Sequence, residues 1–340
     1  MNRPLQTCAA MALCLLISPA AALAQSGDPK AYPTQTAYPK EDKAGVARHL
    51  SAARDIAGDD LAADMRWRCL ISPLDRQYVA GVQHDGIVPA GKIYDNLSSI
   101  GQNAVSAYAL ETSDGIILID ALNTPEEARD IIVPNLKALG LDPARIKYVI
   151  VTHGHGDHYG GAKYLQDTYG AKVMASAADW EMMRKPAPNS PFAKLVPPRQ
   201  DLVVKDGDTL TLGTTSVKLY VTPGHTPGTL SLIFRVSDKV VRLMAGLMGG
   251  TGGGQTPETI RQQINSLQRW RGLADAANVK VLITNHPAHM SATEKQALLR
   301  YAMPGDANPF TTGKARYQRY MQIMEECSRV QLARMGEASD

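Results

Sequence analysis

The chain has 340 residues, is 44% hydrophobic and carries a formal net charge of only +3. This composition is sufficient for one large domain with a full core. The small net charge argues against a nucleic-acid partner. The lysines and arginines are also spread out, without the aromatic interleaving of a single-strand binder. An ordinary globular enzyme is therefore favoured, and RNA-processing functions are disfavoured.

The first 24 residues have the pattern of a secretory signal peptide. Arg3 supplies a positive charge, residues 8–17 form a short apolar stretch, and residues 22–24 form a small-residue cleavage site, so we expect the mature chain to begin at Gln25. A membrane anchor would need about 20 apolar residues, and this stretch is shorter. We therefore expect an exported protein, periplasmic or secreted, without a membrane anchor.

The next part of the chain is predicted to change from a leader to folded structure. Residues 25–43 form a Pro-rich polar leader that we expect to be flexible. Residues 44–63 are predicted as a helix, and residues 67–88 as irregular structure packed on the core. Once the signal peptide is removed, the remaining cysteines are Cys69 and Cys327, and two leftover cysteines often pair in an oxidising compartment. We predict a disulfide between them, with two isolated buried thiols as the alternative.

From residue 93 onward, short apolar strands alternate with stretches of helical spacing. The clearest helical stretches are residues 125–139 and 257–277, and residues 310–335 form a long amphipathic helix. The alternation predicts one α/β domain over residues 44–340, with helices outside two stacked sheets.

Asp120 ends the apolar run of residues 116–119 and has two interpretations. Its carboxylate could accept a ring N–H from a metal-ligating histidine and so fix the tautomer of that ring. It could instead cap a helix that starts near Thr124 and Pro125. Both interpretations remain open from the sequence.

The most informative stretch is residues 149–161, where an apolar β-branched run is followed by potential metal ligands with glycines between them. These ligands are His153, His155, Asp157 and His158. A tight loop at the end of a buried strand points its side chains into one place. The whole chain has only eight histidines, so three within six positions argue against a chance surface cluster.

Two later segments, residues 220–228 and 281–287, repeat the arrangement of apolar strand, turn residues and histidine. They contain His225 and His286. A lone histidine after a strand is more often structural, but the first motif makes a ligand role the better interpretation. Catalytic zinc takes three protein ligands and one open position, so the six candidates suffice for two zinc ions. Iron or manganese could also bind such a mixed nitrogen and oxygen set.

Two loops are predicted to set specificity. Residues 182–198 are Pro-rich with apolar side chains, which suits a semi-rigid lid over an apolar substrate, and Arg184 or Lys185 could supply charge for a substrate carboxylate. Residues 246–254 are Gly-rich and form either a mobile flap or a wall that allows close approach. No Gly-Lys-Ser/Thr follows them, so a phosphate loop is rejected. Thr251 is the nearest polar candidate for substrate binding.

The ligand set predicts a hydrolytic chemistry. Two zinc ions sharing a water would lower its pKa from about 15.7 toward about 7, and the resulting hydroxide would attack a polarised carbonyl. Asp157 is the expected catalytic residue, because it can bind one zinc while accepting a hydrogen bond from that hydroxide. No Gly-x-Ser-x-Gly elbow is present, so a serine nucleophile is not indicated. Tyr159 is expected to pack, and His289 to be a solvated loop residue.

These motifs resemble the metallo-β-lactamase superfamily, whose signature is a strand-terminal His-x-His-x-Asp-His, a Gly-His turn and a further histidine. The resemblance runs from about Lys92 to His289 and is closest to the third, typically periplasmic, subclass, in which no cysteine holds the second zinc. It implies the four-layer αβ/βα sandwich. It also implies the metal ligands: His153, His155 and His225 for the first zinc, and Asp157, His158 and His286 for the second.

The chain also departs from its relatives after the strand predicted at residues 240–245. Lactonases, glyoxalase II and RNase Z relatives usually place a bridging Asp there, and the cysteine-bearing lactamase subclasses place a Cys; this segment has neither. The third subclass normally carries a polar turn whose hydroxyls help to bind the β-lactam carboxylate, whereas this chain has Leu247 and Met248.

Three functions follow from these patterns. The first is β-lactam ring hydrolysis by an exported dinuclear zinc enzyme. The alternative is hydrolysis of another small ester, lactone, amide or carbamate, such as an acyl-homoserine lactone or an aryl ester. A non-catalytic binding protein with degenerate ligands is disfavoured, because all six ligands are intact.

Overall fold

The computed structural model describes residues 38–340 except 84, 85, 87, 187, 189, 191 and 251, and of residues 76, 77 and 80 it describes the backbone alone. The predicted signal peptide and most of the predicted leader lie outside these residues. Within the described part of the chain, no helix has the length and apolar character needed to cross a membrane.

The first sheet has seven strands in the order in which they occur along the chain. They are β1 (Gly91–Tyr94), β2 (Leu97–Ser99), β3 (Tyr108–Thr112), β4 (Gly115–Ile119), β5 (Ile146–Ile150), β6 (Lys172–Ser176) and β7 (Leu202–Val204). Strands β1 to β4 pair antiparallel, and β4 to β7 pair parallel. All residues of β4 are buried, as expected for a parallel strand covered on both faces.

The second sheet has five strands in the order β12-β11-β10-β9-β8. Their bounds are β8 (Thr209–Leu212), β9 (Thr215–Val221), β10 (Leu230–Asp238), β11 (Val241–Leu247) and β12 (Val279–Ile283). Only the β11–β12 pair is parallel among the pairings of these strands. The strand predicted at residues 240–245 is β11, which continues two residues further.

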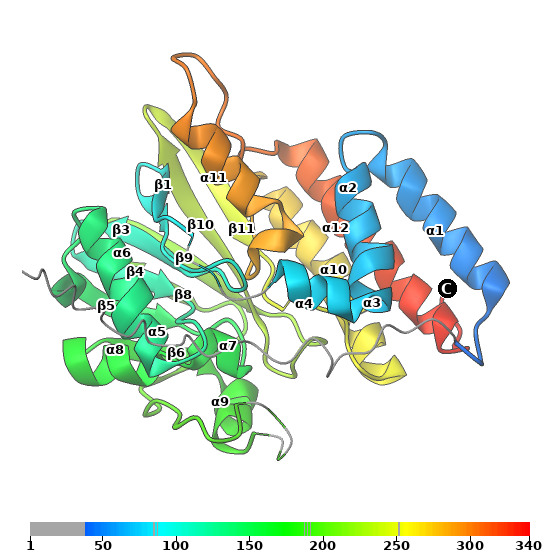
Figure 1. Cartoon of the computed structure of the whole chain (residues 1–340), viewed down its shortest axis with the longest axis horizontal. Helices are drawn as coiled ribbons and strands as arrows, with labels where there is room; N and C mark the ends of the chain where they lie inside the picture. Colours follow the sequence, from blue (N-terminus) through cyan, green and yellow to red (C-terminus); the bar gives the residue numbers. More distant parts are fainter. Residues whose placement is uncertain are drawn as a thin grey trace, which may run out of the picture.

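The two sheets stack between helices on both outer sides, which confirms the predicted sandwich (Figure 1). The side chains of β4 show the layering, because successive strand residues point to opposite faces. Ile117 and Ile119 belong to the core shared with the second sheet, whereas Ile116 and Leu118 belong to the core under the helices of the first sheet.

The helices of the first half are short. They are α5 (Pro125–Glu127), the π-helical turn η3 (Ala128–Ile132), α6 (Val133–Ala138), the 3₁₀ turn η4 (Pro143–Arg145), α7 (Gly156–Tyr159), α8 (Ala162–Tyr169) and α9 (Ala177–Arg184). The first three form the predicted helix at residues 125–139, with a π turn directly before the segment that contains Pro134.

The second half has two long helices, α10 (Pro257–Ala276) and α12 (Lys314–Arg334), with η5 (Pro287–His289) and α11 (Ala292–Arg300) between them. Helix α10 confirms the prediction for residues 257–277, and its start is fixed by a capping box between Thr256 and Thr259. Helix α12 begins later than residue 310, because Thr311 forms a β-bridge with Val281 and Gly313 adopts a φ of 77°.

An N-terminal helical extension, residues 43–82, packs beside α12 (Figure 1). It consists of α1 (Lys43–Ala57), α2 (Ala62–Met65), the π-helical turn η2 (Arg66–Ile71), α3 (Ser72–Leu74) and α4 (Arg76–Val82). The prediction of irregular structure over residues 67–88 is therefore wrong for its larger part. The helical segments η2, α3 and α4 are too short to give a helical apolar period. Of these, η2 packs against α12.

The predicted disulfide between Cys69 and Cys327 is confirmed. The two Cα atoms are 4.6 Å apart, and the bridge joins η2 to α12. The Arg334 guanidinium also donates a hydrogen bond to the carbonyl of Cys69 (3.0 Å). The extension is thus attached to the last helix of the domain.

Candidate metal centre

Three segments that are distant in the sequence end their strands at one edge of the sandwich. His153 follows β5, His225 follows β9, and His286 follows β12. The rings of these histidines and of their neighbours contact one another: the centroids of His153 and His225 are 4.5 Å apart, and those of His158 and His286 are 5.1 Å apart. The structure therefore brings together the histidines that the sequence singled out.

The first group consists of His153, His155 and His225, whose ligand atoms lie within 4.8 Å of one another. Nε2 of His225 lies 3.1 Å from Nε2 of His153 and 3.0 Å from Nδ1 of His155. One ring nitrogen carries either one proton or one lone pair, so it cannot satisfy two such neighbours by hydrogen bonding. Three converging nitrogens of this kind fit a bound cation.

The second group centres on Asp157. Its Oδ2 lies 3.1 Å from Nε2 of His158 and 3.7 Å from Nε2 of His286. Nε2 of His158 is buried and makes no hydrogen bond of acceptable geometry. A buried polar atom without a hydrogen bond is costly, so this nitrogen also fits a metal ligand. His153 lies close enough to Asp157 and His158 to form a compact group with them, so the two groups adjoin.

The outer ring nitrogens of four histidines are held by oxygen acceptors. His153 Nδ1 donates to Thr152 Oγ1 (3.2 Å), His158 Nδ1 to Asp120 Oδ2 (2.8 Å), His225 Nδ1 to the Gly252 carbonyl (3.2 Å), and His286 Nδ1 to the Ala104 carbonyl (2.7 Å). Each bond fixes the ring orientation and leaves Nε2 facing the centre. Oxygen partners of this kind are usual behind metal-ligating histidines.

Asp120 accepts hydrogen bonds from several groups. It accepts hydrogen bonds from the amide (2.8 Å) and hydroxyl (2.9 Å) of Thr152, from His158 (2.8 Å) and from Nδ2 of Asn285 (2.7 Å). The helix that follows is capped by Thr124 instead, whose hydroxyl accepts from the Glu127 amide. Of the two interpretations left open by the sequence, the structure therefore shows the bond to a candidate ligand histidine and not the cap.

The titration behaviour of the cluster reflects its burial. Burial lowers the pKa values of His153 and His225 well below their usual value, and the neighbouring imidazoles lower them further. Burial also disfavours the charged forms of His158 and Asp157, but their mutual attraction outweighs it. The pKa of His158, also beside Asp120, rises to about 10, and that of the Asp157 carboxyl, beside His158 and His286, falls far below its usual range. A cation at Nε2 of His158 would take the place of that proton.

Asp179 joins the first motif to the His225 turn and was not predicted from the sequence. Its carboxylate accepts hydrogen bonds from the amides of Gly154 (2.9 Å) and Gly228 (3.1 Å) and from the hydroxyl of Thr226 (2.8 Å). Burial raises the pKa of Asp179 to about 6 against the effect of these donors. In the sequence, Asp179 only marks the start of a helix, so no local signal reveals its role.

The Gly-rich loop packs against the His225 ring. A Cβ atom at Gly250, which has a φ of 62°, would lie 2.6 Å from Cβ of His225. The Gly250 amide donates to Oδ1 of Asn285 (3.2 Å), and Leu247 and Met248 are buried in the core. These contacts therefore favour a wall rather than a mobile flap for residues 246–254. The group that approaches the glycines closely is the His225 ring. Thr251 lies outside the described residues.

The Pro-rich loop lies over the first motif. Phe192 occupies the space beside Gly156, and Cβ of Met182 would lie 3.2 Å from a Cβ at Gly154. Arg184 is directed elsewhere: its guanidinium bonds Glu181 (2.9 Å) and Gln200 (2.6 Å) at the surface. The loop thus places apolar side chains beside the first motif, and both its role as a lid and the substrate role of Arg184 stay predictions.

Two aromatic side chains near the cluster are buried. Tyr159 is 1% exposed, as its predicted packing role requires. His289 is 6% exposed, so the expectation of a solvated loop histidine is wrong. The His289 ring lies 5.2 Å from that of His286, and its carbonyl accepts a hydrogen bond from the Tyr320 hydroxyl (2.6 Å). Long-range packing by α12 covers it.

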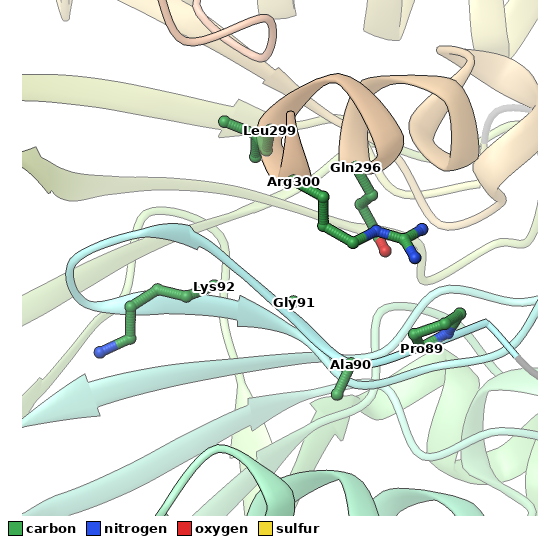
Figure 2. A pocket seen from close by; sticks show the side chains of 7 residues that line it. All are labelled: Pro89, Ala90, Gly91, Lys92, Gln296, Leu299 and Arg300. Carbon is green, nitrogen blue, oxygen red and sulfur yellow. The ribbon is translucent and has the colours of Figure 1, made fainter. Parts of the chain in front are cut away.

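A small pocket is lined by residues of β1 and α11 and of the segment before β1 (Figure 2). Residues 89–92, at the start of β1, form one side of it, and Gln296, Leu299 and Arg300 of α11 form the other. None of these residues contributes to the histidine cluster. The candidate site therefore lies at the convergent ligands and not in this pocket.

Comparison with known proteins agrees with the geometry. The profile of the Metallo-beta-lactamase superfamily matches residues 100–241. A hydroxyacylglutathione hydrolase of Nitrobacter hamburgensis is 30% identical over 195 residues, which cover 53% of this chain and 68% of that protein.

Two solved structures are similar over most of their lengths. A subclass B3 metallo-β-lactamase of Bradyrhizobium japonicum is 25% identical, with a TM-score of 0.59 and coverage of 68% of this chain and 89% of that one. A metallo-β-lactamase of Cronobacter sakazakii, mutated in its HARLDQ motif, is 27% identical, with a TM-score of 0.61 and coverage of 72% and 95%. The chain therefore belongs to the metallo-β-lactamase superfamily and is a hydrolase of this metal-dependent family.

Proposed function

We propose that this chain is an exported dinuclear zinc hydrolase that opens a small cyclic amide or ester, with β-lactams as the first substrate class. The observation that carries the proposal is the convergence of six side chains without a cysteine: His153, His155 and His225 around one position, and Asp157, His158 and His286 around the other. Residues 44–340 would form the single catalytic domain. Export to the periplasm rests on the pattern of the first 24 residues.

The residues of the site suit attack on a carbonyl by water. When bound, two zinc ions would supply a water of lowered pKa and polarise the carbonyl. Asp157 is ionised at neutral pH because its pKa is held low, so its free oxygen lone pairs can accept a proton from, and orient, the attacking water. Asp120 would hold His158 in place, and Phe192 would give the lid an apolar contact with the substrate.

The main alternative is hydrolysis of another activated carbonyl compound, such as an ester, lactone, carbamate or thioester. It is favoured by the relatives named hydroxyacylglutathione hydrolase and by the apolar Leu247 and Met248. Against a glyoxalase-type centre, β11 is followed by Met248 and Gly249, so the bridging Asp expected of those relatives is missing from this turn. The six-ligand set supports the lactamase-like centre more directly.

The proposal is tested by measuring kcat/KM of the zinc-loaded mature protein on a carbapenem, a penicillin and a hydroxyacyl thioester of glutathione. We expect a chelator-sensitive value above about 10⁴ M⁻¹s⁻¹ for at least one β-lactam, within the usual enzyme range, and a loss of at least a hundredfold in His286→Ala. A thioester preferred over both β-lactams by two orders of magnitude or more would replace the proposal by the alternative. Zinc-loaded protein inactive on every carbonyl substrate would contradict both.

A further inference from the structure

The acceptors that hold the candidate ligand histidines differ in what supports them. Those of His153 and His158 are Thr152 and Asp120, which are buried side chains at the ends of β5 and β4. The acceptor of His286 is the carbonyl of Ala104, on the turn between β2 and β3. The orientation of the His286 ring therefore depends on this turn, which is also tied to the neighbouring Asn285 by the bond from the Ser106 amide to the Asn285 carbonyl (2.7 Å).

The tip of the turn is closed by hydrogen bonds within the turn itself. The amide of Ile100 donates to the carbonyl of Ala107 (2.9 Å), and the amide of Gln102 donates to the carbonyl of Val105 (3.0 Å). Asn103 and Ala104 are the two residues at the tip. A displacement of Asn103 would therefore displace the Ala104 carbonyl as well.

The tip is attached to the segment that follows the N-terminal helical extension. Nδ2 of Asn103 donates to the carbonyl of Val82 at the end of α4 (2.7 Å), and the Asn103 amide donates to the carbonyl of Gly86 (3.0 Å). The tip thus lies between the extension on one side and the His286 ring on the other. The extension is itself anchored to α12 by the disulfide of Cys69.

We propose that Asn103 is a positioning residue for the second metal group, because it transmits the position of α4 to His286 through the Ala104 carbonyl. This inference rests on the proposed assignment of Asp157, His158 and His286 to one zinc ion. A ring that loses its outer acceptor keeps its nitrogen but loses its orientation, and changes in such outer partners typically weaken metal binding by about 10- to 100-fold. Asn103 acts one bond further out, so we expect the lower end of that range.

The experiment compares Asn103→Leu, which keeps the shape of the side chain but cannot donate, and Asn103→Ala with the parent protein. Asn135→Ala is the matched control, because Nδ2 of Asn135 donates to the carbonyl of Ile100 at the other end of the same turn (3.0 Å). Zinc is titrated into the full mature chain in competition with a chromophoric chelator, and the cobalt-substituted proteins are compared by their visible absorption. Both readouts are independent of hydrolysis.

We expect both Asn103 variants to bind the second zinc about tenfold more weakly, to keep first-site affinity within about twofold, and to change the part of the cobalt spectrum that appears with the second equivalent. Asn135→Ala should match the parent protein. Unchanged second-site affinity in Asn103→Leu, or equal weakening of both sites or of the control, would overturn the inference. If the parent itself binds fewer than two zinc ions, the metal assignment fails and the inference fails with it.

Discussion

At the residue scale, two buried carboxylates organise the loops of the candidate metal centre. Asp120 connects the ends of β4, β5 and β12, and Asp179 connects the first histidine motif to the His225 turn. Each accepts several hydrogen bonds, so neither can be replaced without leaving donors unsatisfied in the core. The geometry of the candidate ligands therefore depends on residues outside the candidate ligand set.

Replacing Asp179 by Asn tests this dependence. The amide would present N–H groups to the amide of Gly154 or of Gly228, which are themselves donors. A buried mismatch of this kind costs about 1–3 kcal/mol. We expect Asp179→Asn to lower the free energy of unfolding at pH 7 by that amount, as measured by chemical denaturation. Unchanged stability would show that Asp179 does not hold these loops.

The difference in stability between the parent protein and Asp179→Asn should also depend on pH. Burial raises the pKa of Asp179 from 3.8 to about 6, so the unfolded chain loses its proton at a lower pH than the folded chain. The stabilising contribution of protonated Asp179 is present below about pH 4 and is lost as the pH rises through about 6. The parent should lose up to ~3 kcal/mol relative to Asp179→Asn over this range. A stability difference that is constant with pH would contradict it.

At the element scale, the Gly-rich loop is shaped by the histidine that it covers. Gly250 combines a positive φ with close contact to His225, so Ala at this position is strained and also collides with the ring. The loop that follows β11 thus fixes one candidate ligand, His225, by its shape and, through the Gly252 carbonyl, by a hydrogen bond.

We expect Gly250→Ala to displace His225 and to reduce the rise in melting temperature that zinc produces by at least half. Gly272→Ala is the control, because Gly272 lies in α10 and a Cβ there would meet nothing within 4 Å. The control should be more stable than the parent by about 0.5–1 kcal/mol, since Ala is the better helix former, with an unchanged zinc response. Equal zinc responses in both variants would contradict the role of Gly250.

The sequence alone predicts some elements of the fold and some residues of the candidate site, but not others. The strand-terminal motifs, the two sheets and helix α10 are predictable, because periodicity and turn residues are local signals. The partners of Asp120 and Asp179 are not: Asn285 lies 165 residues from Asp120, and Thr226 lies 47 residues from Asp179. Asn285 directly precedes His286 and could have been singled out, whereas nothing near Asp179 indicates its contacts.

At the scale of the whole molecule, the N-terminal helical extension and α12 form one attached unit beside the second sheet (Figure 1). The chain segment between Cys69 and Cys327 contains nearly all of the sandwich and all six candidate ligands. The disulfide therefore restricts the unfolded chain strongly and keeps the extension against α12.

We expect the double variant Cys69→Ser/Cys327→Ser to be less stable by about 2–4 kcal/mol, the usual effect of removing a disulfide. A thiol reductant should destabilise the parent protein by a similar amount and leave the double variant unchanged, as measured by denaturant unfolding. If reductant leaves the stability of the parent protein unchanged while both cysteines react with a thiol reagent, the disulfide does not form in solution.

A dinuclear centre requires two metal ions between the six convergent side chains. The most direct measurement is an anomalous difference map at the zinc edge from crystals of the zinc-loaded mature protein. We expect two peaks, one contacted by His153, His155 and His225 and the other by Asp157, His158 and His286. A single peak, or peaks that these residues do not contact, would contradict a dinuclear centre.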